Sequence, residues 1–153
     1  MNIFVLDRDT QTCAQYHNNK HVVKMVLESA QLLSTTMNLT GGAGPYRTTH
    51  KNHPCTKWVR NSRENYTWLC DLFDSLLVEY TFRYDKIHKC SAYAETFRQH
   101  TFSLPSVGLT PFVLAMPVIY HSNDAVQSYR QYYMAEKSHI ANWGRRAIPY
   151  WWS

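Results

Sequence analysis

The sequence lacks the cysteine spacings that bind structural metals. Its four cysteines form no CxxC pair and no Cys/His spacing of the zinc-finger kind. They are Cys13, Cys55, Cys70 and Cys90. We therefore expect free buried thiols in a reducing compartment, and neither a metal ion nor another cofactor.

Long hydrophobic runs, internal repeats and low-complexity linkers are also absent. The apolar run at the N-terminus is broken at Asp7, so it is too short for a signal peptide or a spanning helix. The 153 residues lie within the usual range of one domain. We expect a single domain over residues 1–153 and a cytoplasmic protein with no membrane partner; if the gene belongs to a phage, the compartment is the host cytoplasm.

Acidic residues are few. The chain has 16 Lys and Arg against 11 Asp and Glu, a net charge of +5 and a pI near 9.1. This balance favours an anionic partner such as DNA or a nucleotide. Aromatic residues reach 14%, including 11 Tyr and 5 Trp, and they serve either to stack on bases or to pack the core.

The apolar periodicity predicts a mainly α fold, a compact helical bundle with a short N-terminal extended segment and long ordered loops. Helices are expected over about residues 10–37, 56–84, 92–99 and from the cap at 122–124 to about 141. The second tract is either one bent helix or two in succession around Asn61 and Ser62. Prolines at 105, 111 and 117 mark a long loop that packs against the domain.

The most informative pattern is a row of six polar side chains on the first helix. They fall within roughly 80° of one another, and apolar residues flank them on both sides. They are His17, His21, Lys24, Glu28, Gln31 and Thr35. A narrow polar stripe on a mostly buried helix is either a functional site or an internally satisfied network.

Glu28 is the centre of the chemistry that this stripe suggests. A carboxylate beside Lys24, His21 and Gln31 can act as a general base or stabilise a cation, and an amine such as that of Lys24 can form a Schiff base. The alternative is a Lys24–Glu28 salt bridge with no chemical role. His17 and His21 are one turn apart, but the nearby lysine and the missing HExxH motif disfavour a metal site.

Basic residues near Pro54 suggest a surface for phosphates. Arg47, Lys57 and Arg60 lie around the start of the second helical tract, where free backbone N–H groups favour an anion. The full set of expected substrate-binding residues is His17, Gln31, Arg47, His53, Lys57, Arg60, Asn65 and Trp68.

Residues 19–33 (NKHVVKMVLESAQLL), the motif Asn52-His53-Pro54 and Trp58 resemble pyrimidine-dimer DNA glycosylases of the phage endonuclease V type. The aromatic C-terminal tail is similar to that of phage-encoded relatives. The resemblance implies a compact helical fold and an enzyme that cuts a base from its sugar and then breaks the strand through an imine. It also implies that Glu28, seven residues after His21, is the catalytic carboxylate.

The sequence departs from the family in one respect. In the family, the nucleophile is the amine of the residue that removal of the initiator Met exposes. Here the bulk of Asn2 disfavours that removal. The nucleophile is then the Met1 amine, Lys24, or a water molecule without strand cutting. Two other functions stay open: an enzyme acting on a free nucleotide or a modified base in phage DNA modification, and a non-catalytic module that binds nucleic acid or a host protein.

Overall fold

The computed structural model describes all residues, 1–153, and contains six α-helices and no strand. This confirms the predicted mainly α fold. The α-helices are α1 (Thr10–Tyr16), α2 (Asn19–Leu39), α3 (Pro54–Asn61), α4 (Arg63–Tyr84), α5 (Ala94–Gln99) and α6 (Ala125–Glu136). Four 3-10 turns join them: η1 (Lys89–Tyr93), η2 (His100–Ser103), η3 (Val118–Tyr120) and η4 (Ser138–Ile140).

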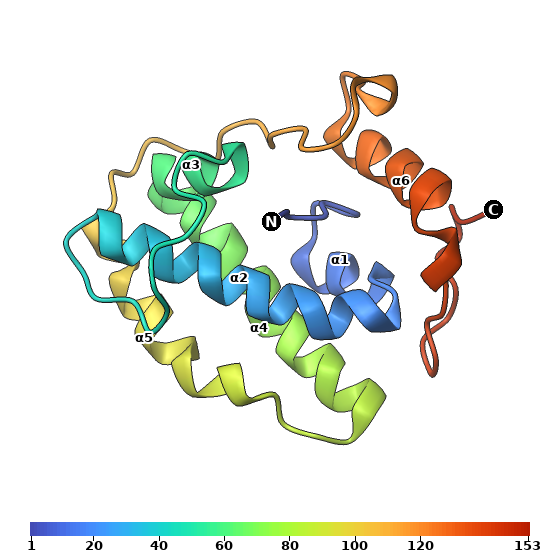
Figure 1. Cartoon of the computed structure of the whole chain (residues 1–153), viewed down its shortest axis with the longest axis horizontal. Coiled ribbons are helices and arrows are strands. Elements are labelled where there is room, and N and C mark those ends of the chain that lie inside the picture. Colours follow the sequence, from blue (N-terminus) through green and yellow to red (C-terminus); the bar gives the residue numbers. More distant parts are fainter.

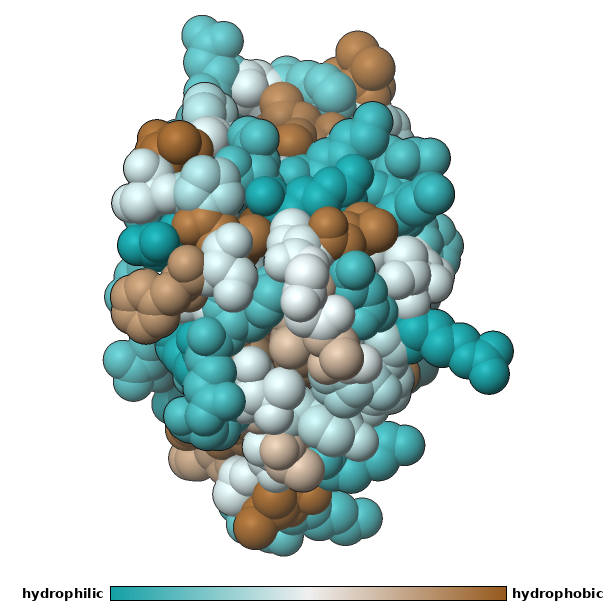
Figure 2. All heavy atoms as spheres, turned by 90° about the vertical axis from the view of Figure 1, so that its left-hand side faces the viewer, coloured by the Kyte–Doolittle hydropathy of each residue, from teal (hydrophilic) through white to brown (hydrophobic).

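Helices α2 and α4 cross at the centre of the molecule, with α1 and α3 packed against α4 (Figure 1). One core cluster of 31 buried residues extends from Ile3 to Trp143, so distant parts of the chain share it. Figure 2 shows the side near α5, where hydrophilic residues separate small hydrophobic groups. None of the helices is both long enough and apolar enough to cross a membrane.

The prediction of one continuous helix over about residues 10–37 is wrong. The chain breaks at His17, whose backbone is extended, and Asn18 caps the new helix by accepting a hydrogen bond from the His21 N–H at 2.9 Å. Arg83 donates to the His17 carbonyl at 2.6 Å. A side-chain cap and a buried guanidinium thus satisfy the groups that a continuous helix would have bonded internally.

The other helical boundaries follow local caps. The tract from 56 to 84 is two helices, because Ser62 is extended and its hydroxyl caps α4 at the Asn65 N–H. The last helix ends at Glu136 rather than near 141, and η4 follows it. Residues 2–6 form no regular element, as expected of an extended segment.

A buried ion cluster ties the helices to the C-terminal tail. Glu79 accepts hydrogen bonds from Arg83 at 2.7 Å and from Arg146 at 2.6 Å. Arg83 also donates to the Gln15 carbonyl at 2.9 Å, next to the break between α1 and α2. The cluster of Glu79, Arg83 and Arg146 therefore holds three segments of the chain together.

Replacing Glu79 with Gln should destabilise the protein by about 3–5 kcal/mol, because it leaves buried guanidinium charge without its partner. Urea unfolding of the Glu79→Gln protein measures the change. The matched control is Asp85→Asn, which breaks an exposed pair with Arg145 and should alter stability little. Equal stability of the two variants would contradict a structural role for the cluster.

Candidate active site

The N-terminal amine and the Glu28 carboxylate form the centre of the site. The Met1 nitrogen lies 3.4 Å from Glu28 Oε1, and the Asn2 N–H donates to the same oxygen at 3.2 Å. Both side chains are largely buried, with 4% of Met1 and 11% of Glu28 exposed. An α-amine and a carboxylate thus meet in a partly desolvated place, where electrostatic interactions are stronger than in water.

The second carboxylate oxygen is not satisfied by the protein. Glu28 Oε2 is buried and has no hydrogen-bond partner. The Lys24 ammonium, on a side chain that is 67% exposed, lies 3.6 Å from it. A buried acceptor without a partner costs free energy, and such atoms concentrate at functional sites. Oε2 is therefore free to accept a proton or a hydrogen bond from a substrate.

The first residues of the chain bring the amine into the molecule. Ile3, Phe4, Val5 and Leu6 are all buried, and Arg130 donates to the Leu6 carbonyl at 2.9 Å. Chain termini are usually poorly ordered unless packing holds them. Here four consecutive apolar side chains hold the N-terminus between α3 and α6 (Figure 1).

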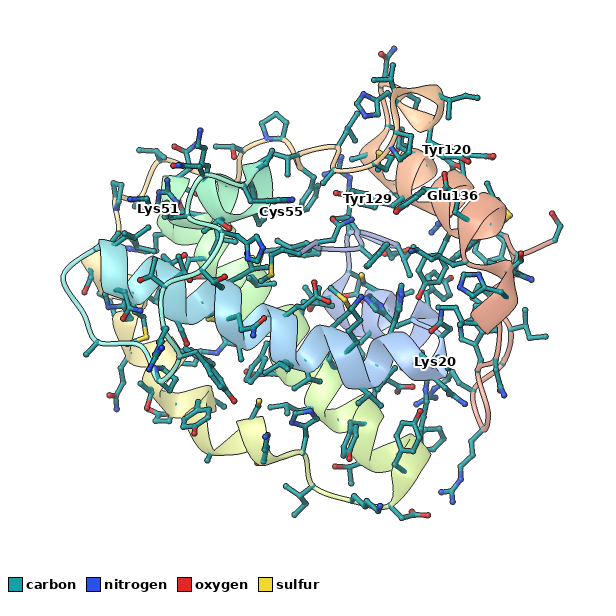
Figure 3. All side chains as sticks on the ribbon, viewed as in Figure 1. Lys20, Lys51, Cys55, Tyr120, Tyr129 and Glu136 are labelled. Carbon is teal, nitrogen blue, oxygen red and sulfur yellow. The ribbon has the colours of Figure 1, made fainter.

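The side chain of Asn2 also fixes the position of the Met1 amine. Its Nδ2 donates to the Ala115 carbonyl at 3.0 Å, and its Oδ1 lies 3.5 Å from the Tyr129 hydroxyl and 3.7 Å from Cys55 Sγ. Cys55 and Tyr129 approach the N-terminal segment from opposite sides (Figure 3). Tyr129 donates to the Val113 carbonyl at 2.7 Å, which holds the adjoining loop in place.

His53 and Cys55 lie close to the amine at the start of α3. His53 Nδ1 accepts a hydrogen bond from the Cys55 N–H at 3.1 Å, so the proton of the neutral ring is on Nε2. Burial, and then the positive Met1 amine, lower the pKa of His53. Burial raises the pKa of Cys55 to about 11, so its thiol stays protonated at neutral pH.

His17 and His21, the two histidines of the polar stripe, lie away from the contact between Met1 and Glu28. His17 is fully buried and donates from Nδ1 to the Cys13 carbonyl at 2.7 Å. His21 is two helical turns, about 10.5 Å of rise, before Glu28, and its Nδ1 pairs with the Tyr133 hydroxyl at 2.9 Å. No group of three or more His, Cys, Asp or Glu side chains is placed to hold a metal ion.

Acid should destabilise the fold through this histidine pair. Burial lowers the pKa of His17 to about 4 and that of His21 to about 3. Below about pH 6.5 the unfolded chain takes up protons that the folded protein does not. The melting temperature should therefore fall as the pH drops from 7 towards 4, and less steeply in His17→Gln than in the control His50→Gln, whose ring is exposed. Parallel pH profiles for both would contradict this assignment.

The predicted basic residues lie on α3 and in the loop before it, and none of them forms a hydrogen bond or an ion pair with Glu28. Arg47 and Lys57 are exposed, and Arg60 donates to the Lys51 carbonyl at 2.7 Å. Lys51 marks this side of the site in Figure 3. Pro54 has no N–H and that of Cys55 is bonded to His53, so two of the three residues in the first turn of α3 offer no N–H to a phosphate.

Asn65 and Trp68 lie in the core. The Asn65 amide donates to the Trp58 carbonyl at 2.8 Å and to Thr110 Oγ1 at 2.7 Å, and the Trp68 indole donates to the Arg8 carbonyl at 3.0 Å. Both residues therefore support the elements behind the site. Gln31 is half-buried on α2, one turn after Glu28.

A protein family described as pyrimidine dimer DNA glycosylase matches residues 1–92. This match covers 92 of the 153 residues and includes Met1, Glu28 and His53. No curated protein and no solved structure matches the chain significantly.

Proposed function

Because this chain belongs to the pyrimidine dimer DNA glycosylase family, we propose that it is a DNA glycosylase that removes a damaged or modified pyrimidine, with its N-terminal amine as nucleophile. The observation that carries the proposal is the buried contact between the Met1 amine and Glu28, at 3.4 Å. A nucleophile beside a positioned base is the arrangement that covalent catalysis needs.

The geometry favours Met1 over Lys24 as the nucleophile. The Lys24 side chain is largely exposed, whereas the amine of Met1 is held by Glu28 and by the anchors of Asn2. Lys24 instead places a positive charge at the mouth of the site, where it serves to bind phosphate.

The reaction proceeds in two stages. The uncharged amine attacks C1′ of the sugar, the bond from C1′ to the base breaks, and the base leaves with that electron pair and takes up a proton. Glu28 accepts a proton from the amine and stabilises the positive charge on the sugar. The nitrogen lone pair then expels O4′, which takes up the proton held by Glu28, and the opened sugar carries an imine at C1′. Glu28 accepts a proton from C2′, and the bond from C3′ to its oxygen breaks with departure of the phosphate.

The target nucleotide must leave the base stack to reach this buried site. Arg47, Lys57 and Lys51 supply the phosphate contacts that hold the flanking strand, and affinity should fall as salt rises. His53 can donate a hydrogen bond from Nε2, and Gln31 is placed to contact the sugar or base. His21 and His17 keep these elements in position rather than touching the substrate.

The proposal is tested with oligonucleotides that carry a pyrimidine dimer or a modified pyrimidine. Borohydride reduces an imine to a stable amine, and mass spectrometry maps the adduct. We expect base release and an adduct at Met1. The mass of the intact protein shows whether Met1 is retained; if it is not, the nitrogen of Asn2 lies 3.2 Å from the same carboxylate oxygen.

Other outcomes of this experiment assign other functions. An adduct at Lys24 would make that residue the nucleophile, and base release without an adduct would indicate a water molecule activated by Glu28. If no DNA reacts, the proposed glycosylase is wrong. Turnover of a free nucleotide would then support a nucleotide enzyme, and salt-sensitive binding alone would support a binding module.

A further inference from the structure

His53 is held in a fixed orientation at the start of α3. Its Nδ1 accepts a hydrogen bond from the Cys55 N–H at 3.1 Å, and its backbone N–H donates to the His50 carbonyl at 3.0 Å. Pro54 lies in the first turn of the helix and has no N–H. The Cys55 N–H is therefore the first that α3 offers, and the imidazole caps it. The ring cannot rotate without losing this bond.

The same bond decides which protons the ring carries. A nitrogen that accepts a hydrogen bond is unprotonated, so the neutral ring has its proton on Nε2. A second proton would enter at Nδ1, facing the Cys55 N–H and the positive end of α3. Burial is the main cause that lowers the pKa of His53; the Met1 amine and His50 lower it further, and Glu28 opposes them. The ring is therefore uncharged at neutral pH.

The His53 ring lies beside the groups that we propose to react. Cys55 Sγ is 3.7 Å from Asn2 Oδ1, and the Asn2 N–H donates to Glu28 Oε1 at 3.2 Å, so the first turn of α3 packs on the N-terminal segment (Figure 3). Among the charged groups, the Met1 amine has the largest effect on the pKa of His53, as expected of close neighbours. The side chain is half-buried, and its bond to Cys55 leaves Nε2 free to donate to a substrate.

We propose that His53 is a catalytic residue that stays neutral and donates a hydrogen bond from Nε2 to O2 of the departing pyrimidine; this inference rests on the proposed glycosylase function. When the bond from C1′ to N1 breaks, its electron pair passes to the base and spreads from N1 onto O2. A fixed N–H donor beside that oxygen stabilises the negative charge as it develops. A neutral imidazole at a helix N-terminus can polarise a carbonyl in this way. His53 keeps its proton, and the anionic base takes a proton from water.

The position of the ring favours O2 over the other polar groups of the base. O2 is attached to the carbon next to N1, on the edge of the base nearest C1′, whereas the group at C4 is on the far side. A donor beside the Met1 amine, which attacks C1′, is therefore closest to O2. Cytosine, thymine and their products altered at C5 or C6 all keep this acceptor. The contact thus serves any of these bases and does not depend on the lesion.

Two substitutions at His53 separate the donor from the helix cap. Asparagine is among the best residues at an N-cap, so His53→Asn keeps an acceptor for the Cys55 N–H but has no donor at the place of Nε2. Glutamine is longer by one carbon, and its amide N–H reaches that place without a charge. In single-turnover reactions on DNA with a pyrimidine dimer or a modified pyrimidine, we expect His53→Asn to release the base about 10²-fold more slowly than the parent. His53→Gln should recover about tenfold of this loss.

His88 provides the matched control. Its Nδ1 accepts a hydrogen bond from the Cys90 N–H at 3.1 Å and caps η1, which is the same local geometry as at His53. The ring lies beyond the C-terminal end of α4, packed against Tyr80 at 4.9 Å between centroids. His88→Asn should release the base at the parental rate. Melting curves of all three variants show whether any loss of rate comes from the fold.

The pH dependence distinguishes a neutral donor from a general acid. A neutral donor gives the same ratio of the parental rate to the His53→Asn rate throughout pH 7 to 9. An imidazolium that gave its proton to the base would make this ratio fall about tenfold per pH unit, because its charged fraction falls by that factor above its pKa. Such a fall would overturn the proposal, and so would equal losses in the Asn and Gln variants.

The protonation of the ring can be measured without DNA. Nitrogen-15 NMR of the histidine side chains, with the His53→Asn spectrum to assign the signal, should show a neutral ring with its proton on Nε2 at pH 7. A charged ring, or a proton on Nδ1, would overturn the proposal.

The two proposals fail in different ways. If the parent releases no base from any DNA, the glycosylase assignment is wrong and the role of His53 falls with it. If the parent releases the base and the His53→Asn protein matches its rate, the glycosylase stands and the role of His53 is wrong.

Discussion

The Glu28→Gln protein should fold as the parent does and release the base about 10²–10⁴ times more slowly. Glutamine keeps the volume of the side chain and can still accept the Asn2 N–H, but it cannot accept a proton from the amine or stabilise a cationic sugar. Single-turnover kinetics on lesion-containing DNA measure the loss, and a melting curve shows whether the fold is intact.

Lys24→Gln is the matched control for the carboxylate. It removes the other charged group beside Glu28 Oε2, but the buried amine keeps its contact with Oε1. We expect weaker binding that depends less on salt, with the chemical step nearly unchanged. A Glu28→Gln protein that keeps the parental rate, or a Lys24→Gln protein that loses as much, would contradict the role of Glu28.

Extending the chain by one residue before Met1 should reduce base release by about two orders of magnitude and abolish borohydride trapping. The extension converts the amine into an amide, which is not nucleophilic, and it forces an extra residue into a place where Met1 is already packed against the core. The comparison is between a protein carrying a short N-terminal extension and one carrying the same residues after Ser153, which is exposed.

The C-terminally extended protein should form as much adduct as the parent. Melting curves of both proteins separate loss of the nucleophile from loss of the fold. If the N-terminally extended protein still forms the imine, the mapped adduct shows whether the reacting amine is the new N-terminus or a side chain, and an adduct on a side chain would contradict the role of Met1.

The sequence predicted the central carboxylate because Glu28 lies on a helix whose periodicity is strong. The same periodicity failed at His17, where the pattern continues but the helix does not. The break depends on Arg83, 66 residues away in the chain, and on the Asn18 cap. A tertiary hydrogen bond of this kind leaves no trace in local hydrophobic spacing.

The surroundings of the amine could not be predicted for a related reason. Asn2 contacts Ala115 and Tyr129, which are 113 and 127 residues further along the chain. None of these residue types marks a catalytic site by itself. Asn65, which we expected to bind substrate, holds the loop at Thr110 through its side-chain amide, and this long-range contact could not be read from its position in the helix.

The hydrogen bond from Asn2 to the Ala115 carbonyl joins two parts of the chain that have different roles in the function we propose. Met1, Glu28, His53 and Cys55 all lie within the segment that matches the family, residues 1–92. The loop from 105 to 124 and α6 lie outside it, yet they complete the wall around the amine. Under the function that we propose, changes in this second part would alter the lesion preference and leave the proposed catalytic groups unaltered.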